Sequence, residues 1–229
     1  MQRTSLTATS GDMGHNARPM TRSMRILATI LALAAAASGG WWATRTLTER
    51  EPAPTLLHAT AIDPARALGA LDLVDQRGQR FANDRLRGRW SVIYFGFTTC
   101  PMICPATMAE LRDFAARVQN LPQPARPQVI LITIDPAHDT PEIMGRYVEA
   151  FDPMFLGLTG SSAAIDSAAD EFSVAHSKAN GQIDHSTTLY VVDPRGALSA
   201  VFTPPHTAAA LAEDYGRLAG GLAERLAGS

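Results

Sequence analysis

The sequence of 229 residues has almost no net charge, no internal repeat and very little cysteine. Its 20 Lys and Arg residues are balanced by 22 Asp and Glu residues, for a formal net charge of -2. Without a basic excess the chain lacks the electrostatic signature of a nucleic-acid-binding protein, so no nucleic acid is expected as a partner. The absence of repeats excludes a solenoid, and two cysteines are too few for a disulfide-stapled scaffold. The length indicates one domain with additional segments.

Both cysteines lie in one short stretch, FTTCPMICP at residues 97–105. The β-branched and aromatic run at 91–97 directly before it predicts a buried strand. The segment Thr107–Val118 after it has the apolar spacing of an amphipathic helix. The two thiols are therefore expected in a strand-to-helix turn, which is where α/β folds commonly carry their chemistry.

The prolines of this stretch sharpen the expectation. Each cysteine precedes a proline, which disfavours helical backbone at the residue before it. We therefore expect a tight loop, with Pro105 at the first helical position and Cys104 close to the helix N-terminus. Free N–H groups and the helix dipole favour an anion there, so the pKa of the Cys104 thiol is predicted to be lowered. A structural disulfide is the alternative, but so small a ring stabilises by only about 2 kcal/mol. We interpret the pair as a redox couple or a soft-metal clamp.

An uncharged run lies near the N-terminus, at residues 26–43. It is just long enough to cross a hydrocarbon core of about 30 Å, and Trp41 and Trp42 would lie at the far interface. Arginines in the polar segment 1–25 predict a cytoplasmic tail and place the rest of the chain outside. We interpret 26–43 as an uncleaved transmembrane anchor, with a cleaved signal peptide as the alternative. In both interpretations the domain is exported to an oxidising compartment.

Residues 44–67 contain proline and threonine without a clear period, which predicts a tether, and the globular domain is expected over 68–229. The domain is expected to begin with a hairpin over 71–81, followed by a strand, the cysteine loop and a helix. A strand over 128–135, a helix, a strand, a helix and a further strand come next. An antiparallel hairpin over 187–202 and a last helix complete it. This order predicts an α/β thioredoxin-like fold with extra strands at its N-terminal end, preceded by one transmembrane helix.

Among the six histidines, His185 has the most informative position. It stands in the segment IDHST, directly before the strand expected over 188–192. In a thioredoxin-like layout, the loop that enters this strand faces the cysteine turn. A lone histidine is more often solvated or part of a core, but two thiols placed opposite favour a metal ligand. Asp184 is either a partner that fixes the imidazole tautomer or a simple turn residue.

Three motifs together resemble the Sco/SenC family of membrane-anchored copper chaperones. They are YFGFTTCPMICP at 94–105, TIDP and DTP within 133–141, and DHST and YVVDP within 184–194. The resemblance extends from about Leu71 to Tyr215 and implies a thioredoxin-like fold. It also implies a role in building the dinuclear copper centre of cytochrome c oxidase subunit II, and an anchor in the bacterial inner membrane with the domain facing the periplasm.

The resemblance implies that copper is bound by Cys100, Cys104 and His185. Asp184, Met102 and Asp135 are candidates for the groups around the metal. Thiolates suit Cu(I) and an imidazole also suits Cu(II), so both oxidation states are expected. Three ligands leave an open position for transfer of the metal from an upstream copper donor to subunit II or another copper-receiving protein.

Two departures from the family pattern concern the surroundings of the metal. Met102 stands where the family usually has an acidic residue, and His138 stands where it usually has a basic one. The lost negative charge is expected to weaken Cu(II) binding more than Cu(I) binding. We expect Met102 to have a packing role, with ligation by its thioether as the alternative.

A metallochaperone is not expected to be an enzyme, but an enzymatic alternative stays open. An exported thiol–disulfide oxidoreductase would use Cys100 and Cys104 as a redox pair to reduce partner cysteines. The usual signature of that class is CxxC, and it has no need of His185. A peroxidase shares the fold but needs no clamp of two cysteines and a distant histidine. Zinc suits the same three ligands, although structural zinc normally takes four.

Overall fold

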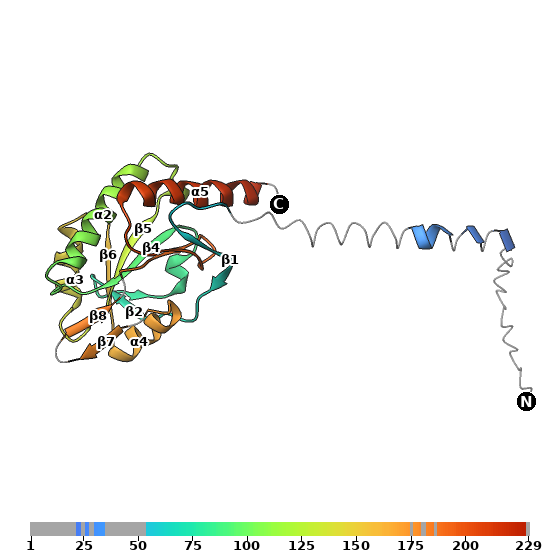
Figure 1. Ribbon diagram of the computed structural model, residues 1–229. Coiled ribbons are helices and arrows are strands. Elements are labelled where there is room, and N and C mark those ends of the chain that lie inside the picture. Colours follow the sequence, from blue (N-terminus) through green and yellow to red (C-terminus); the bar gives the residue numbers. More distant parts are fainter. Residues whose placement is uncertain are drawn as a thin grey trace, which may run out of the picture. The chain divides into compact units, whose positions relative to one another are not determined.

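The computed structural model describes residues 22–23, 26–27, 30–34, 54–174, 176–179, 182–185 and 187–227, with the side chains of 176–185 and 222–227 excepted (Figure 1). The chain divides into two units, Met1–Glu51 and Pro52–Ser229. Within the described ranges no helix is long and apolar enough to cross a membrane. Most of the anchor predicted over 26–43 lies outside the described residues, as do residues 1–21 of the predicted tail.

The second unit is built on one eight-stranded mixed sheet, in the order β1-β10-β9-β4-β5-β6-β2-β3. Its strands are β1 (Thr60–Ala67), β2 (Leu73–Asp75), β3 (Arg80–Phe81), β4 (Ser91–Gly96), β5 (Gln128–Thr133), β6 (Leu156–Thr159), β9 (Leu189–Val192) and β10 (Ala197–Phe202). The helices are α2 (Ile103–Val118), α3 (Pro141–Glu149), α4 (Ser162–Glu171) and α5 (Ala208–Ala227), with short 3-10 turns at Asn83–Leu86 and Gln123–Ala125. The strands β4, β5 and β6 are parallel, and β9 is antiparallel to β4. From β2 onward, the predicted α/β order of the helices and the strands of this sheet is confirmed.

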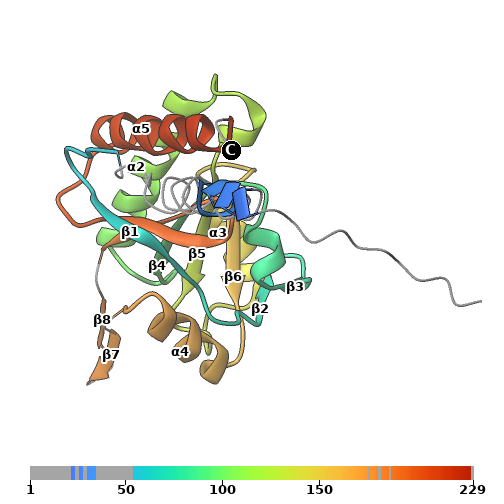
Figure 2. The same cartoon turned by 90° about the vertical axis from the view of Figure 1, so that its right-hand side faces the viewer.

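The central strands are buried on both faces because their side chains alternate between two apolar cores. Val92 and Tyr94 of β4 belong to the core that also contains residues of α2, α3 and α5. Ile93 and Phe95 point into the other core, beneath α4. Figures 1 and 2 show α2 and α5 on one side of the sheet and α4 on the other. This double coverage is why β4 and β5 are nearly continuous apolar runs in the sequence.

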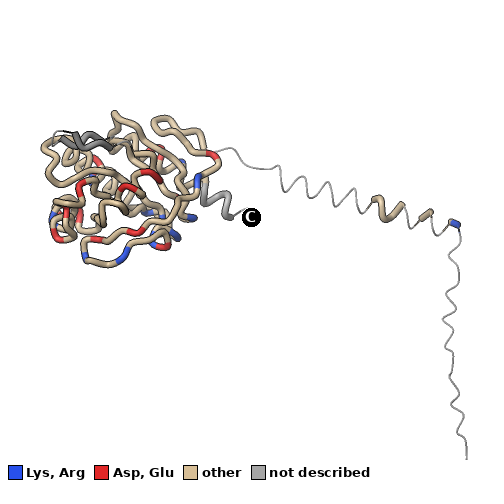
Figure 3. Tube along the Cα trace, turned by 90° about the horizontal axis from the view of Figure 1, so that it is seen from below, with Lys and Arg blue, Asp and Glu red and all other residues tan. Residues whose placement is uncertain are grey.

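Basic and acidic residues both occur throughout the described part of the domain (Figure 3). Several of them form surface ion pairs, such as Arg80–Asp72 and Arg112–Asp113, at 2.7 and 2.8 Å. This distribution agrees with the balanced composition of 20 Lys and Arg residues against 22 Asp and Glu residues.

The predicted tether over 44–67 is wrong at its C-terminal end, because residues 60–67 form β1 and pair with β10. The domain therefore begins before residue 68. Pro64 lies within β1, and proline is tolerated in a sheet only at an edge or an irregularity. Here β1 is the edge strand, and its register with β10 shifts between Ala61 and Arg66. The proline and the partly exposed face make this segment look like a linker in the sequence.

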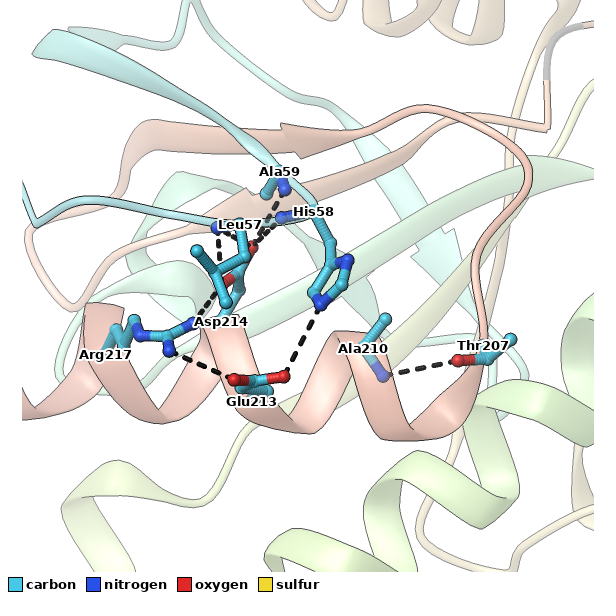
Figure 4. Close-up of polar contacts among 8 residues, drawn as sticks. All are labelled: Leu57, His58, Ala59, Thr207, Ala210, Glu213, Asp214 and Arg217. Atoms are coloured by element: carbon cyan, nitrogen blue, oxygen red, sulfur yellow. Dashed lines mark hydrogen bonds and ion pairs between the residues drawn. The ribbon is translucent and has the colours of Figure 1, made fainter.

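The residues before β1 are fixed to α5 by one buried carboxylate (Figure 4). Asp214 is fully buried and accepts from the backbone N–H groups of Leu57, His58 and Ala59 at 2.6–3.0 Å. Arg217 donates to the same carboxylate at 2.8 Å. Burial alone would raise the pKa of Asp214, but the three backbone donors and Arg217 outweigh it, and the pKa lies below its usual value. A neighbouring surface contact joins His58 to Glu213 at 3.4 Å.

The segment that carries His185 differs from the prediction of an entry loop. The strands β7 (His176–Ala179) and β8 (Gln182–His185) form a separate two-stranded antiparallel sheet. Its register places His176 opposite His185. His185 is therefore the last residue of a short strand, and the chain then enters β9 at Leu189.

Candidate metal centre

The cysteine loop joins β4 to α2 and is held at its base by the end of β5. Gly96 lies opposite Thr133, and the Ile134 N–H donates to the Gly96 carbonyl at 2.9 Å. The buried carboxylate of Asp139 then accepts from the Thr98 N–H at 3.1 Å, and from the Thr98 and Thr133 hydroxyls at 2.5 Å each. These bonds fix the start of the loop two residues before Cys100.

Both cysteines are free thiols, but they lie in different surroundings. Cys104 is completely buried in the core beneath α2, and the Tyr94 hydroxyl donates to its Sγ at 3.4 Å. Cys100 is half-buried, and its Sγ accepts from the Cys104 N–H at 3.4 Å. The structure thus brings together the two thiols that the sequence predicted, one accessible and one enclosed.

The predicted lowering of the pKa of Cys104 is wrong. Burial raises the pKa of this thiol to about 12, although Tyr94 and the Phe97 backbone favour the thiolate. At Cys100 burial also opposes ionisation, but hydrogen bonds from Cys104, Met102 and Ile103 outweigh it, and the pKa is lowered. The anion-favouring position at the helix N-terminus belongs to Cys100.

The reason lies in where α2 begins. The helix begins at Ile103, two residues earlier than predicted, so Cys104 lies inside the first turn and points to the core. Pro105 is tolerated there because the first N–H groups of a helix have no intrahelical partner to lose. The preference of a residue before proline for extended backbone is overridden by burial of the Cys104 side chain.

Gly96 allows the Cys104 thiol to lie against the sheet. A β-carbon at this position would stand 3.0 Å from Cys104 Sγ and 2.9 Å from Tyr94 Cε1. A real β-carbon essentially never lies under 3.0 Å from another atom, so any larger residue must displace the Tyr94 ring, and the Cys104 thiol must also give by a few tenths of an ångström. The sequence motif contains this glycine, but its spatial reason is visible only in the fold.

Tyr147 on α3 is a further residue near the thiols, and no sequence pattern points to it. Its ring packs against the core that contains Cys104, and its hydroxyl oxygen is buried with no hydrogen-bond partner within the described part of the chain. Burial raises the pKa of Tyr147, and the charges of Cys104, Cys100 and Asp139 raise it further. The hydroxyl therefore remains protonated at neutral pH.

Of the residues proposed around the metal, Met102 and Asp135 lie at this edge of the sheet. The expected packing role of Met102 is wrong, because the side chain is 78% exposed beside Cys100 at the start of α2. Asp135 follows the end of β5, where its N–H donates to Thr133 Oγ1 at 2.9 Å and its carbonyl accepts from the N–H of His138 at 3.0 Å. His138, the second departure from the family pattern, is exposed.

The chain connection keeps His185 within reach of the sheet edge that carries the cysteine loop. Leu189, the first residue of β9, lies opposite Tyr94, two residues before the end of β4. His185 is four residues upstream, and four residues span at most about 14 Å. The side chains of His185 and Asp184 are outside the described part, so their place at the metal stays a prediction. Among the described side chains, no group of three or more His, Cys, Asp or Glu residues could hold a metal ion.

The sheet order and the thiol pair between β4 and α2 define a thioredoxin-like protein with a CxxxC site. Comparison with known proteins then gives the family, because the family model described as SCO1/SenC matches residues 59–220. This chain belongs to the SCO1/SenC family, and the resemblance found in its motifs is confirmed.

Relatives and solved structures agree with this assignment. An SCO2-like protein of Rickettsia prowazekii is 36% identical over 141 residues, which are 58% of this chain and 68% of the relative. The mitochondrial SCO2 homolog of Bos taurus is 32% identical over 213 residues, covering 90% of this chain and 80% of the relative. The copper-bound structure of Arabidopsis thaliana ScoI is 28% identical with a TM-score of 0.62, covering 71% of this chain and 99% of that one. Copper-bound yeast Sco1 is 29% identical with a TM-score of 0.58, covering 72% and 90%.

Proposed function

We propose that this protein is a copper metallochaperone that binds the metal through Cys100, Cys104 and His185. It takes copper from an upstream donor and delivers it to the dinuclear centre of cytochrome c oxidase subunit II. The observation that carries the proposal is the pair of free thiols fixed at the start of α2, in a chain whose family includes copper-bound structures.

The unequal thiols suit a metal that must enter and leave. Cys100 is accessible and has a lowered pKa, so its thiolate is available to an arriving soft cation. The Cys104 thiol has a raised pKa, so it is protonated in the metal-free protein, and its proton is released when the metal binds to the sulfur. Binding therefore releases protons, and copper affinity falls as the pH falls. An imidazole from His185 would complete three ligands and leave a position open to the partner.

We also propose that residues 26–43 anchor the chain in the bacterial inner membrane by a single span, with the copper-binding domain in the periplasm. The length and the lack of charge of this run support the proposal, as do the arginines before it. Alkaline carbonate extraction tests it. The full chain should stay with the membrane fraction and a chain lacking 1–45 should not, and release of both would contradict the anchor.

The asymmetry of the thiols also favours one alternative, an exported thiol–disulfide oxidoreductase. The Cys100 thiolate would attack a disulfide of the partner and form a mixed disulfide, releasing one partner thiol. Cys104 would then attack Cys100 Sγ, leaving an intramolecular disulfide on this chain and a reduced dithiol on the partner. This activity requires neither copper nor His185.

A complementation experiment at limiting copper separates the two functions. Cells that depend on this protein should fail to assemble active cytochrome c oxidase when they carry His185→Ala, while purified His185→Ala should still reduce a model disulfide. The variant His58→Ala, which removes only an exposed contact with Glu213, is the matched control. Normal oxidase assembly in the His185→Ala strain would overturn the copper proposal and favour the oxidoreductase.

A further inference from the structure

His206, just before α5, holds the chain segment that follows β8. Its Nε2 lies 3.0 Å from the carbonyl oxygen of Thr187. A carbonyl oxygen can only accept, so Nε2 carries the proton and donates. The other ring nitrogen, Nδ1, is buried and has no hydrogen-bond partner within the described residues. Among the described residues the ring therefore makes a single polar contact, and that contact is to a residue two positions after His185.

The segment that carries His206 is also hydrogen-bonded to α2, the helix that follows Cys100 and contains Cys104. The Ala208 N–H, at the first residue of α5, donates to Glu110 Oε2 at 2.6 Å. Glu110 lies on α2, six residues after Cys104, or about 9 Å along the helix axis. The start of α5 thus has one bond to the helix of the thiols and another to the segment that leads from His185 into the sheet.

We propose that His206 is a positioning residue for the copper site. Together with the bond between Ala208 and Glu110, its bond to Thr187 sets the place of the His185 strand relative to α2. The inference rests on the proposed ligand set of Cys100, Cys104 and His185. His206 itself is not proposed as a ligand, because its Nε2 is hydrogen-bonded to the Thr187 carbonyl. Its effect on the metal is transmitted through the backbone between Thr187 and His185.

The chemistry of the contact allows a rescue experiment. Glutamine can place an amide N–H donor near the position of Nε2, whereas leucine fills a similar volume without a donor. A residue that serves only to fill space would be replaced well by leucine and no better by glutamine. Thr207→Ala is the stability control, because it removes the bond from the Ala210 N–H to Thr207 Oγ1, at 3.3 Å, without touching Thr187.

The experiment uses the full-length chain, as the parent and with His206→Leu, His206→Gln, Thr207→Ala or His185→Ala, each titrated with Cu(II) sulfate. The thiolate-to-copper charge-transfer band reports the ligand set, and amide hydrogen exchange of the metal-free protein reports the order of residues 187–189. We expect His206→Leu to weaken Cu(II) binding about tenfold, as displaced supporting groups of metal ligands commonly do. It should also speed exchange at 187–189, and His206→Gln should restore both properties.

The outcomes separate this inference from the proposed function. If His185→Ala loses copper while His206→Leu binds it as the parent chain does, the positioning role is wrong and the copper site stands. If His185→Ala binds copper unchanged, the proposed ligand set itself is wrong. Equal weakening in His206→Leu and Thr207→Ala would show that only the stability of the α5 start matters, and would also overturn the inference.

Discussion

Only three residues separate the two cysteines of the site, but their thiols differ in ionisation. Cys100 receives the N–H groups of the first turn of α2, which lower its pKa, and burial raises the pKa of Cys104 to about 12. We predict that iodoacetamide at neutral pH modifies Cys100 much faster than Cys104. In Cys104→Ser, the pH profile of the alkylation rate should have its midpoint below the ordinary thiol value of about 8.5. Equal rates for the two cysteines in the reduced parent protein would contradict this assignment.

A second residue-scale prediction concerns Gly96, because Cys104 Sγ lies where a β-carbon would collide with it. Gly96→Ala should destabilise the fold by about 1–3 kcal/mol and weaken Cu(I) binding, since the thiol or the Tyr94 ring must move. Denaturant unfolding and competition with a Cu(I) chelator measure the two effects. Gly216→Ala on α5 is the control, as nothing lies within 4 Å of its added carbon, and it should stabilise by about 1 kcal/mol. A neutral Gly96→Ala would mean that the thiol does not need this close approach.

The identities of the two thiols were predictable from the sequence, whereas their ionisation was not. The sequence has two cysteines between a strand pattern and a helix pattern, and their short spacing already predicts that they lie close together. Which thiol is buried depends on whether the helix begins at Ile103 or at Pro105, a difference of two residues. Helix ends are weakly specified by local sequence, and here core packing of Cys104 overrides the effect of Pro105. Tyr147 comes from a helix some forty residues away, so only the tertiary fold brings it near.

At the level of the elements, one carboxylate, that of Asp214, attaches the segment before β1 to the helix α5. The folded-state pKa of Asp214 is lowered, so its contribution to stability is present at neutral pH and is lost as the pH falls below about 4. Asp214→Asn should lower the free energy of unfolding by about 2 kcal/mol at pH 7 and flatten the loss of stability below pH 4. Urea unfolding over a pH series measures both.

Glu213→Gln is the control for this element, because the neighbouring carboxylate is 48% exposed and its contacts lie on the surface. It should change the free energy of unfolding by less than about 0.5 kcal/mol. If Asp214→Asn behaved like Glu213→Gln, the buried carboxylate would not hold the Leu57–Ala59 backbone in solution.

Helices with clear start signals were predicted well, and strands at the margin of the sheet were not. Thr140, directly before α3, accepts from the Ile143 N–H, and Ser161, directly before α4, accepts from the Ala164 N–H, as hydroxyl side chains at helix starts commonly do. In contrast, β1 has no regular alternation and contains Pro64, and it becomes a strand because β10 offers an edge. A local pattern cannot reveal a partner that lies more than a hundred residues away.

At the scale of the whole molecule, the boundary of the folding unit is the feature to test. A chain lacking residues 1–52 should be soluble and unfold in one cooperative transition, since it keeps β1 and the three backbone donors to Asp214. A chain lacking 1–67, the boundary that the sequence predicts, loses both and should unfold at a clearly lower temperature. Circular dichroism during heating compares the two. Aggregation of the longer chain would show that the N-terminal segment packs on the domain, and equal midpoints would show that β1 contributes nothing.

The two cysteines and His185 are proposed to bind copper together, and X-ray absorption at the copper edge measures this ligand set. The chain lacking 1–52 is reduced, loaded with one equivalent of Cu(I) and compared with His185→Ala. His176→Ala serves as the control, because His176 lies opposite His185 in the β7–β8 register. We expect two sulfur ligands and one nitrogen ligand in the parent and in His176→Ala, and loss of the nitrogen ligand in His185→Ala. A spectrum of His185→Ala identical to that of the parent would contradict it.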